Sequence, residues 1–121
     1  MNILAIDDEQ VVADSLVEIL KMFGFSASSG YSGSHAIDRA LDAPFDVLIT
    51  DVVMSEMTGI DAAIEIRKVL PNRKVLLVSG NNRTAEMLKD AHERGHDFDI
   101  VAKPVHPSVI IDRLNAMSVV N

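Results

Sequence analysis

The sequence predicts an α/β fold in which a parallel β-sheet is covered by helices on both faces. Short apolar runs alternate with longer segments of helical period, and the connections between them are short. Alternating strands and helices of these lengths specify a parallel sheet. The apolar runs are also nearly continuous, which is typical of strands buried on both faces.

Five strands are predicted. Four of them are apolar runs bounded by polar or turn residues, whereas the second is weaker because serines interrupt it. In chain order the strands cover residues 3–6, 25–28, 47–50, 75–78 and 98–102.

Five helices alternate with these strands, and local signals mark where each begins. Thr58 and Asp61 have the spacing of a capping box, with Asp in place of the usual Glu or Gln. Ser32 and Asn82 are N-cap candidates, and Pro107 stands at a first helical position. The predicted helices cover residues 11–23, 34–41, 60–70, 83–93 and 107–117.

The helix ends carry their own signals. Gly24 and Gly95 lie just past two of the predicted helices, where glycine is favoured because it adopts positive φ without a steric penalty. Pro44 stops the second helix and Pro71 follows the third. We find no linker, repeat or low-complexity tract, so we expect residues 1–121 to form one domain with no output domain.

Composition excludes several classes of protein. The chain has 121 residues, with 18 acidic and 11 basic side chains and a formal charge of −7. This balance argues against nucleic-acid binding, which uses faces rich in Lys and Arg. The absence of cysteine excludes disulfides and thiolate metal sites. The first apolar run is too short for a signal peptide or a membrane span, so we expect a cytoplasmic protein.

Three carboxylates follow predicted strands and indicate a metal site. Asp7 and Asp8 come directly after the first strand, and Asp51 follows the third. Because the carboxyl ends of parallel strands lie at one edge of the sheet, these side chains should share a crevice. Carboxylate and water oxygens suit Mg²⁺. The alternatives are that one of the paired aspartates caps the following helix and that Asp51 is a structural turn residue.

The same crevice should also hold groups that bind a phosphoryl oxygen. Asp51 can act as a nucleophile toward phosphorus, since carboxylates form aspartyl-phosphates. Lys103 follows the fifth strand and supplies a compact positive charge, and Pro104 after it allows a cis peptide bond. Ser79 ends the fourth strand, where its hydroxyl could donate to a phosphoryl oxygen or serve as a turn residue.

Together these motifs resemble the receiver domain of two-component response regulators. Asp7-Asp8, Asp51 to Gly59, Ser79-Gly80 and Lys103-Pro104 stand in the order and at the spacing of that family, and the resemblance runs from Ile3 to about Leu114. It implies a flavodoxin-like, doubly wound sheet of strand order 2-1-3-4-5 with five helices.

The resemblance also implies a role for each residue. Asp51 is the phosphoacceptor for a sensor histidine kinase or a histidine phosphotransfer protein, and Ser79 and Lys103 bind the phosphoryl oxygens. Mg²⁺ is held by Asp8, Asp51 and the main-chain carbonyl of Val53, with Asp7 acting through water. A downstream output protein or domain binds the phosphorylated form. Another expected partner is a second copy of the chain, in a homodimer that forms on phosphorylation. The chain is then a stand-alone receiver or the N-terminal part of a larger regulator, and not an enzyme in the usual sense.

One departure from the family pattern and two alternative functions accompany this interpretation. Receivers usually carry an aromatic residue where this chain has Ile100. Phe98 faces the same side of the predicted strand, where it either substitutes for that aromatic residue or simply packs against a helix. An Mg²⁺-dependent phosphohydrolase usually has a second Asp at the position of Val53. A pseudo-receiver, which binds partners without phosphorylation, is disfavoured because all the expected charged site residues are present.

Overall fold

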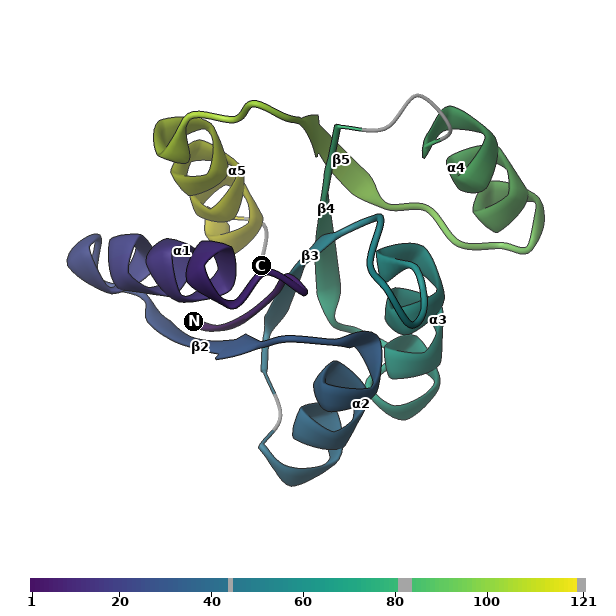
Figure 1. Cartoon of the computed structure of the whole chain (residues 1–121), viewed down its shortest axis with the longest axis horizontal. Coiled ribbons are helices and arrows are strands. Elements are labelled where there is room, and N and C mark those ends of the chain that lie inside the picture. The colour runs from purple at the N-terminus through teal and green to yellow at the C-terminus, as the bar shows by residue number, and fades with distance from the viewer. Residues whose placement is uncertain (44, 81–83, 120–121) are drawn as a thin grey trace.

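Parallel strands build the centre of the computed structural model, which describes residues 1–43, 45–80 and 84–119, with the backbone alone for 118 and 119. Within these residues five strands form one sheet in the order β2-β1-β3-β4-β5 (Figure 1). The predicted fold class and strand order are therefore confirmed. The strands are β1 (Asn2–Ile6), β2 (Ser26–Gly30), β3 (Val47–Asp51), β4 (Lys74–Ser79) and β5 (Asp99–Ala102).

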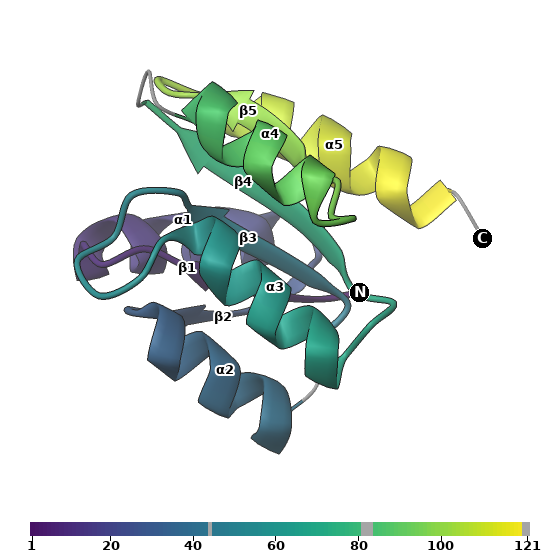
Figure 2. The ribbon, with the colours of Figure 1, turned by 90° about the vertical axis from the view of Figure 1, so that its right-hand side faces the viewer.

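Helices cover both faces of this sheet. α1 and α5 lie on one face, and α2, α3 and α4 form a row on the other (Figures 1 and 2). Their bounds are α1 (Gln10–Met22), α2 (Gly33–Asp42), α3 (Gly59–Val69), α4 (Thr84–Glu93) and α5 (Pro107–Val119). None of the described helices is both long and apolar enough to cross a lipid bilayer.

Alternate strand residues fill two cores, one on each face of the sheet. Leu4, Leu48 and Leu77 point toward the α2–α4 side and are at most 1% exposed. Their neighbours Ile3, Ile49 and Leu76 pack on the α1–α5 side. This alternation follows from the two-residue period of a strand, and complete burial of each such side chain contributes about 1.5–3 kcal/mol. Each face of the sheet therefore has an apolar core of its own.

The predicted helix caps that lie in described residues are present. Ser32 Oγ accepts a hydrogen bond from the His35 amide at 3.0 Å, and Thr58 Oγ1 accepts one from the Asp61 amide at 3.0 Å. Gly24 and Gly95 follow α1 and α4 with φ of 89° and 88°. The predictions for Pro44 and Asn82 fall outside the described residues.

All five strands differ from their predicted bounds by one or two residues: β1, β3 and β4 are longer than predicted, β2 starts and ends later, and β5 starts later. β2 runs to Gly30 because it pairs with β1 along its whole length, from Asn2 with Ser26 to Ile6 with Gly30. Pairing thus extends the strand beyond the residues that its weak apolar pattern indicated. β5 begins at Asp99, one residue after the predicted start, and Phe98 belongs to the loop before it.

Candidate phosphoacceptor site

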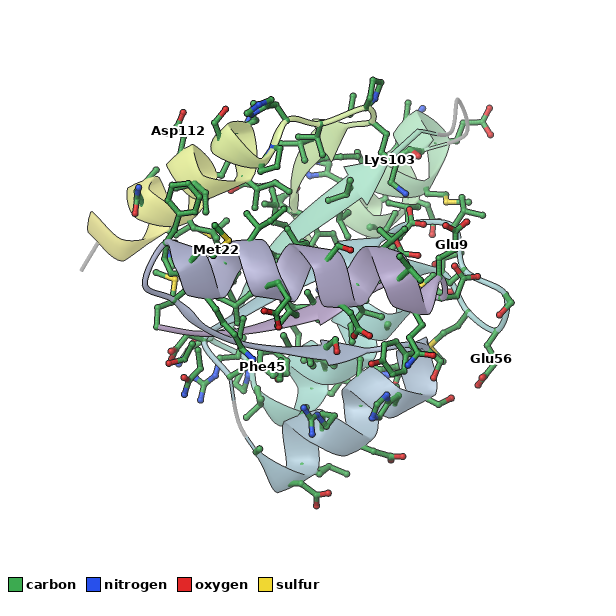
Figure 3. All side chains as sticks on the ribbon, turned by 60° about the vertical axis from the view of Figure 1, so that its left-hand side comes forward. Glu9, Met22, Phe45, Glu56, Lys103 and Asp112 are labelled. Carbon is green, nitrogen blue, oxygen red and sulfur yellow. The ribbon has the colours of Figure 1, made fainter. Side chains whose placement is uncertain are left out.

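Strand pairing places the predicted acidic residues next to one another. Ile6 pairs with Thr50 in the register of β1 and β3, so the residues that follow them, Asp7 and Asp51, are neighbours at the carboxyl edge. Lys103 follows β5, and its side chain extends over the N-terminal end of α1, on the side where Glu9 is labelled (Figure 3). Three separate parts of the sequence therefore meet at this edge.

Asp7 is the buried member of the cluster, at 7% exposure. Its Oδ1 accepts a hydrogen bond from the Glu9 amide at 2.9 Å. Glu9 is the N-cap of α1, so this bond is a turn contact before the helix, and the alternative that Asp7 caps the helix is wrong. Burial raises the pKa of this carboxyl, and the charges of Asp51 and Asp8 raise it further, against the lowering effects of the Glu9 amide and Lys103. An electrostatic environment of this kind favours binding of a cation.

Asp8 is exposed and turns toward the loop between β3 and α3. Its Oδ2 accepts a hydrogen bond from the Ser55 amide at 3.2 Å. This contact joins the first acidic pair to the segment that follows Asp51. Sequence reasoning did not find it, because a backbone donor leaves no signal in the identity of residue 55.

Asp51 ends β3 and faces the lysine. Its Oδ2 lies 3.3 Å from Lys103 Nζ, and Asp7 Oδ2 lies 3.9 Å from the same nitrogen. The Asp51 side chain is 13% exposed and that of Lys103 is 38% exposed. The ammonium thus balances part of the negative charge, and the Asp51 carboxylate remains open to a reactant. The Lys103–Pro104 peptide bond is cis.

Gly59, at the start of α3, allows the helix to approach Asp51 from behind. A Cβ atom at this position would lie 2.1 Å from the main-chain oxygen of Asp51, which is not possible for a real side chain. The Gly59 amide also donates to the Val52 carbonyl at 2.8 Å. Glycine is therefore required for the contact that fixes the backbone of the candidate nucleophile.

The three carboxylates fit a shared divalent cation. One oxygen from each of Asp7, Asp8 and Asp51 lies within 4.8 Å of the other two. Opposite ligands of an octahedral Mg²⁺ are separated by about 4 Å, twice the metal–oxygen distance. Val53 lies two residues beyond Asp51 in the same loop, with an exposed side chain, and the role of its carbonyl stays a prediction.

Ser79 ends the strand next to β3 and is 6% exposed. In the register of β3 and β4, Asp51 pairs with Val78, so Ser79 lies one residue beyond the partner of Asp51. Its main-chain oxygen accepts from the Lys103 amide at 2.8 Å, which links it to the lysine.

Thr84, the first residue of α4, is a neighbour of Ser79 that the sequence interpretation missed. The two hydroxyl groups are hydrogen bonded, and Thr84 is 5% exposed. The available signal was a hydroxyl residue at the start of the helix that follows the Ser79 strand.

Phe98 packs against a helix, which was one of its two predicted roles. The Arg67 guanidinium of α3 lies 4.4 Å from the centroid of the Phe98 ring, and His96 stacks on the ring with an interplanar angle of 4°. Phe98 precedes β5, at the end of that strand remote from Lys103. Ile100 is half-buried in the same core.

An apolar groove extends from the site between α1 and the segment after β5. Asp7, Asp51 and Lys103 line one end of it. Its walls are aliphatic, with Val12 and Ile110 among the residues on either side.

With this geometry in place, comparison with known proteins identifies the family. The chain matches the model of the response regulator receiver domain over residues 3–115, and it therefore belongs to that family. Receiver domains are in general signalling modules rather than enzymes, and they bind Mg²⁺ at an acidic pocket.

Relatives of similar length agree with this assignment. The chain is 30% identical to chemotaxis protein CheY of Thermotoga maritima, over 97% of each chain. It is 28% identical to response regulator receiver protein CpdR of Brucella abortus, over 96% of this chain and 95% of that protein. Response regulator TrrA of Thermotoga maritima, solved in complex with Mg²⁺-BeF, shares the fold with a TM-score of 0.81 and 23% identity, over 95% of this chain and 96% of that one.

Proposed function

We propose that Asp51 accepts a phosphoryl group from the phosphohistidine of a sensor histidine kinase or a histidine phosphotransfer protein, and that the reaction depends on Mg²⁺. The observation that carries the proposal is the position of the Asp51 carboxylate. It lies 3.3 Å from the Lys103 ammonium and within reach of a cation shared with Asp7 and Asp8. The groups that we propose as nucleophile, counter-charge and metal ligands thus lie together at one edge of the sheet, which supports the proposal.

The chemistry is a single transfer of a phosphoryl group. An Asp51 carboxylate oxygen forms the new bond to phosphorus, and the nitrogen–phosphorus bond of the donor breaks with its electron pair going to nitrogen. The imidazole leaves neutral, because its other ring nitrogen has taken a proton from solvent. Lys103 turns from the carboxylate to a phosphoryl oxygen, and Ser79 donates its hydroxyl proton to another. Mg²⁺, when bound, supplies positive charge that offsets the negative charge of the phosphoryl oxygens.

Asp7 and Asp8 hold the metal, with Asp7 acting through water and the Val53 carbonyl completing the protein ligands. The raised pKa of Asp7 supports this role, because a buried carboxylate among like charges is stabilised when a cation binds. The amide of Ser55 orients Asp8 for the same purpose.

Phosphorylation switches a surface that a partner reads. We assign residues 1–121 to a single receiver domain that works in the cytoplasm, without direct binding to nucleic acid or membrane. A downstream output protein or domain, or a second phosphorylated copy, would bind the switched surface. A stand-alone receiver and the N-terminal part of a larger regulator both agree with this function.

Mass spectrometry of the intact protein tests the proposal. Wild type, Asp51→Ala and Asp112→Ala are incubated with acetyl phosphate, with Mg²⁺ or with EDTA. Asp112 is an exposed aspartate on α5 and serves as the matched control. Wild type and Asp112→Ala should gain one phosphoryl mass with Mg²⁺, and Asp51→Ala should gain none.

Three results would contradict the proposal. Wild type that gains no mass would leave a binding module that does not use phosphorylation. Equal gain by Asp51→Ala would place the phosphoryl group elsewhere. Hydrolysis of many equivalents of acetyl phosphate per protein molecule, dependent on Asp51, would favour a phosphohydrolase. Loss of the gain in EDTA is the expected sign of a metal requirement.

A further inference from the structure

Contacts at both ends of α4 hold this helix to the rest of the domain. Thr84 and Ala91 are its buried residues, and Met87 and Leu88 between them are only partly buried. α4 lies at the end of the row of helices, beside β5 (Figures 1 and 2). A helix with so little buried surface depends strongly on its terminal contacts.

Charged and aromatic contacts secure the C-terminal end. His92 Nδ1 lies 2.5 Å from Asp97 Oδ1, and the Asp97 main-chain oxygen accepts from Arg67 of α3 at 3.2 Å. The same Arg67 guanidinium covers the ring of Phe98. This end of α4 is therefore joined to α3 and to the loop before β5, well away from Asp51.

The N-terminal end is secured at the phosphoacceptor site itself. The hydroxyl of Thr84 is hydrogen bonded to the hydroxyl of Ser79, and both side chains are buried. A serine hydroxyl has one proton to donate. If Ser79 gives that proton to a phosphoryl oxygen, it cannot give it to Thr84 at the same time.

We infer that Thr84 is a positioning residue that competes with the phosphoryl group for the Ser79 hydroxyl, so that phosphorylation of Asp51 releases the N-terminal end of α4. The inference rests on the proposed function of Asp51 and Ser79. Either hydroxyl can be the donor in this pair. We take Ser79 as the donor that holds the helix before phosphorylation, a direction that the binding test below decides. Afterwards Ser79 donates to the phosphoryl oxygen, and α4 stays attached through its C-terminal contacts.

This competition connects chemistry at Asp51 to a helix surface by one exchange of a hydrogen bond. It also predicts that Thr84 weakens the binding of a phosphoryl group, because the existing hydrogen bond must break first. A neutral hydrogen bond of this kind changes an equilibrium by about fivefold. Removal of the Thr84 hydroxyl should therefore tighten binding of a phosphoryl mimic by about that factor.

The experiment compares wild type, Thr84→Val and Thr84→Ser by NMR. Valine keeps the shape of threonine without the hydroxyl, and serine keeps the hydroxyl. Binding of beryllofluoride in the presence of Mg²⁺ is titrated, with Asp51→Asn as the control for the site. Amide exchange of Leu88, whose N–H bonds to the Thr84 carbonyl in an α-helix, reports the N-terminal end of α4, and Glu93 reports the other end.

We expect Thr84→Val to bind beryllofluoride about fivefold more tightly than wild type, and Thr84→Ser to bind like wild type. Without the mimic, Leu88 should exchange about fivefold faster in Thr84→Val than in wild type, while Glu93 is unchanged. Addition of the mimic to wild type should raise the exchange of Leu88 toward the Thr84→Val value.

Unchanged or weaker binding by Thr84→Val would overturn the competition, since weaker binding would mean that Thr84 donates to Ser79 and supports it. If Thr84→Val does not fold, the exchange of Leu88 in wild type decides, and no change on adding the mimic overturns the inference. Failure of the proposed function is recognised separately, because wild type and Asp51→Asn would then show the same binding.

Discussion

α3 and α4 follow adjacent strands and cover the same face of the sheet, yet they are held in different ways. α3 buries six of its eleven residues, and Gly59 lets it press against the main chain of Asp51. α4 buries two of its ten residues, and its first one bonds to Ser79 through a hydroxyl. α3 thus fixes the residue that would carry the phosphoryl group, whereas α4 is attached to the residue that would detect it.

The difference teaches how one sheet edge can be both rigid and responsive. Closely packed atoms resist displacement, so we expect the backbone of Asp51 to keep its position when the site is phosphorylated. A hydrogen bond between two hydroxyl groups can be exchanged for another at little net cost. The two helices divide these tasks between them.

Truncation of core residues gives the largest expected effect. Ile66→Ala in α3 removes a fully buried side chain and should lower the free energy of unfolding by about 4 kcal/mol. Leu88→Ala in α4 removes a partly buried one and should cost about 1 kcal/mol. Urea unfolding of both variants measures the two losses. Equal losses would show that α4 is anchored by its core as firmly as α3.

The two glycines beside the site should give the next largest effect. Gly59→Ala forces the Asp51 carbonyl to move and should cost about 2 kcal/mol, with slower uptake of a phosphoryl group at Asp51. Gly80→Ala is the matched control, because its Cβ would meet Lys103 Cβ at an ordinary 3.4 Å. That change should stay within about 0.5 kcal/mol of wild type. Urea unfolding and intact mass measure stability and uptake, and a harmless Gly59→Ala would contradict the tight contact.

The smallest effect concerns the C-terminal contact of α4. The hydrogen bond that His92 Nδ1 donates to the Asp97 carboxylate raises the pKa of His92 above its ordinary 6.5, and the Asp97 charge raises it further. The contribution of the His92–Asp97 contact to the stability of the folded protein is therefore complete below pH 6.5. It is lost as pH rises through the raised pKa of His92 in the folded protein. NMR titration of His92 should show the raised pKa in wild type and a lower one in Asp97→Asn.

Amide exchange of Glu93 then reports the same contact. After correction for the intrinsic pH dependence of exchange, opening at this end should increase with pH in wild type and be flat in His92→Gln. α3 contains no histidine, so Ile66 should show no such trend. A pH trend of equal size at both positions would mean that the whole domain, and not α4, responds.

Much of the fold and of the charged site followed from the sequence, for a physical reason. Buried parallel strands are continuous apolar runs, and the residue after such a run must lie at the carboxyl edge. For this reason the positions of Asp7, Asp51 and Lys103 along the chain are enough to predict that they lie together. The caps at Ser32 and Thr58 were predictable because they depend on residues close in sequence.

The missed features depend on contacts between distant backbone segments or on rotamers. The amide of Ser55 reaches Asp8, and the absence of a Cβ at Gly59 matters only because the Asp51 carbonyl lies behind it. The bond between Ser79 and Thr84 needs the start of α4 to meet the end of β4, which residue type alone does not determine. The end of β2 at Gly30 was missed because pairing with β1, and not its own residues, extends it.

The place of Lys103 after β5 has a mechanical consequence. Asp7 follows β1 and Asp51 ends β3, and each of these strands has a neighbour on both sides, whereas β5 pairs only with β4 among the described strands. A strand with one partner is held by half as many ladder hydrogen bonds and yields more easily to a load. The positive side of the site is therefore the compliant one, and substitutions in β5 offer a way to move the ammonium without disturbing the carboxylates.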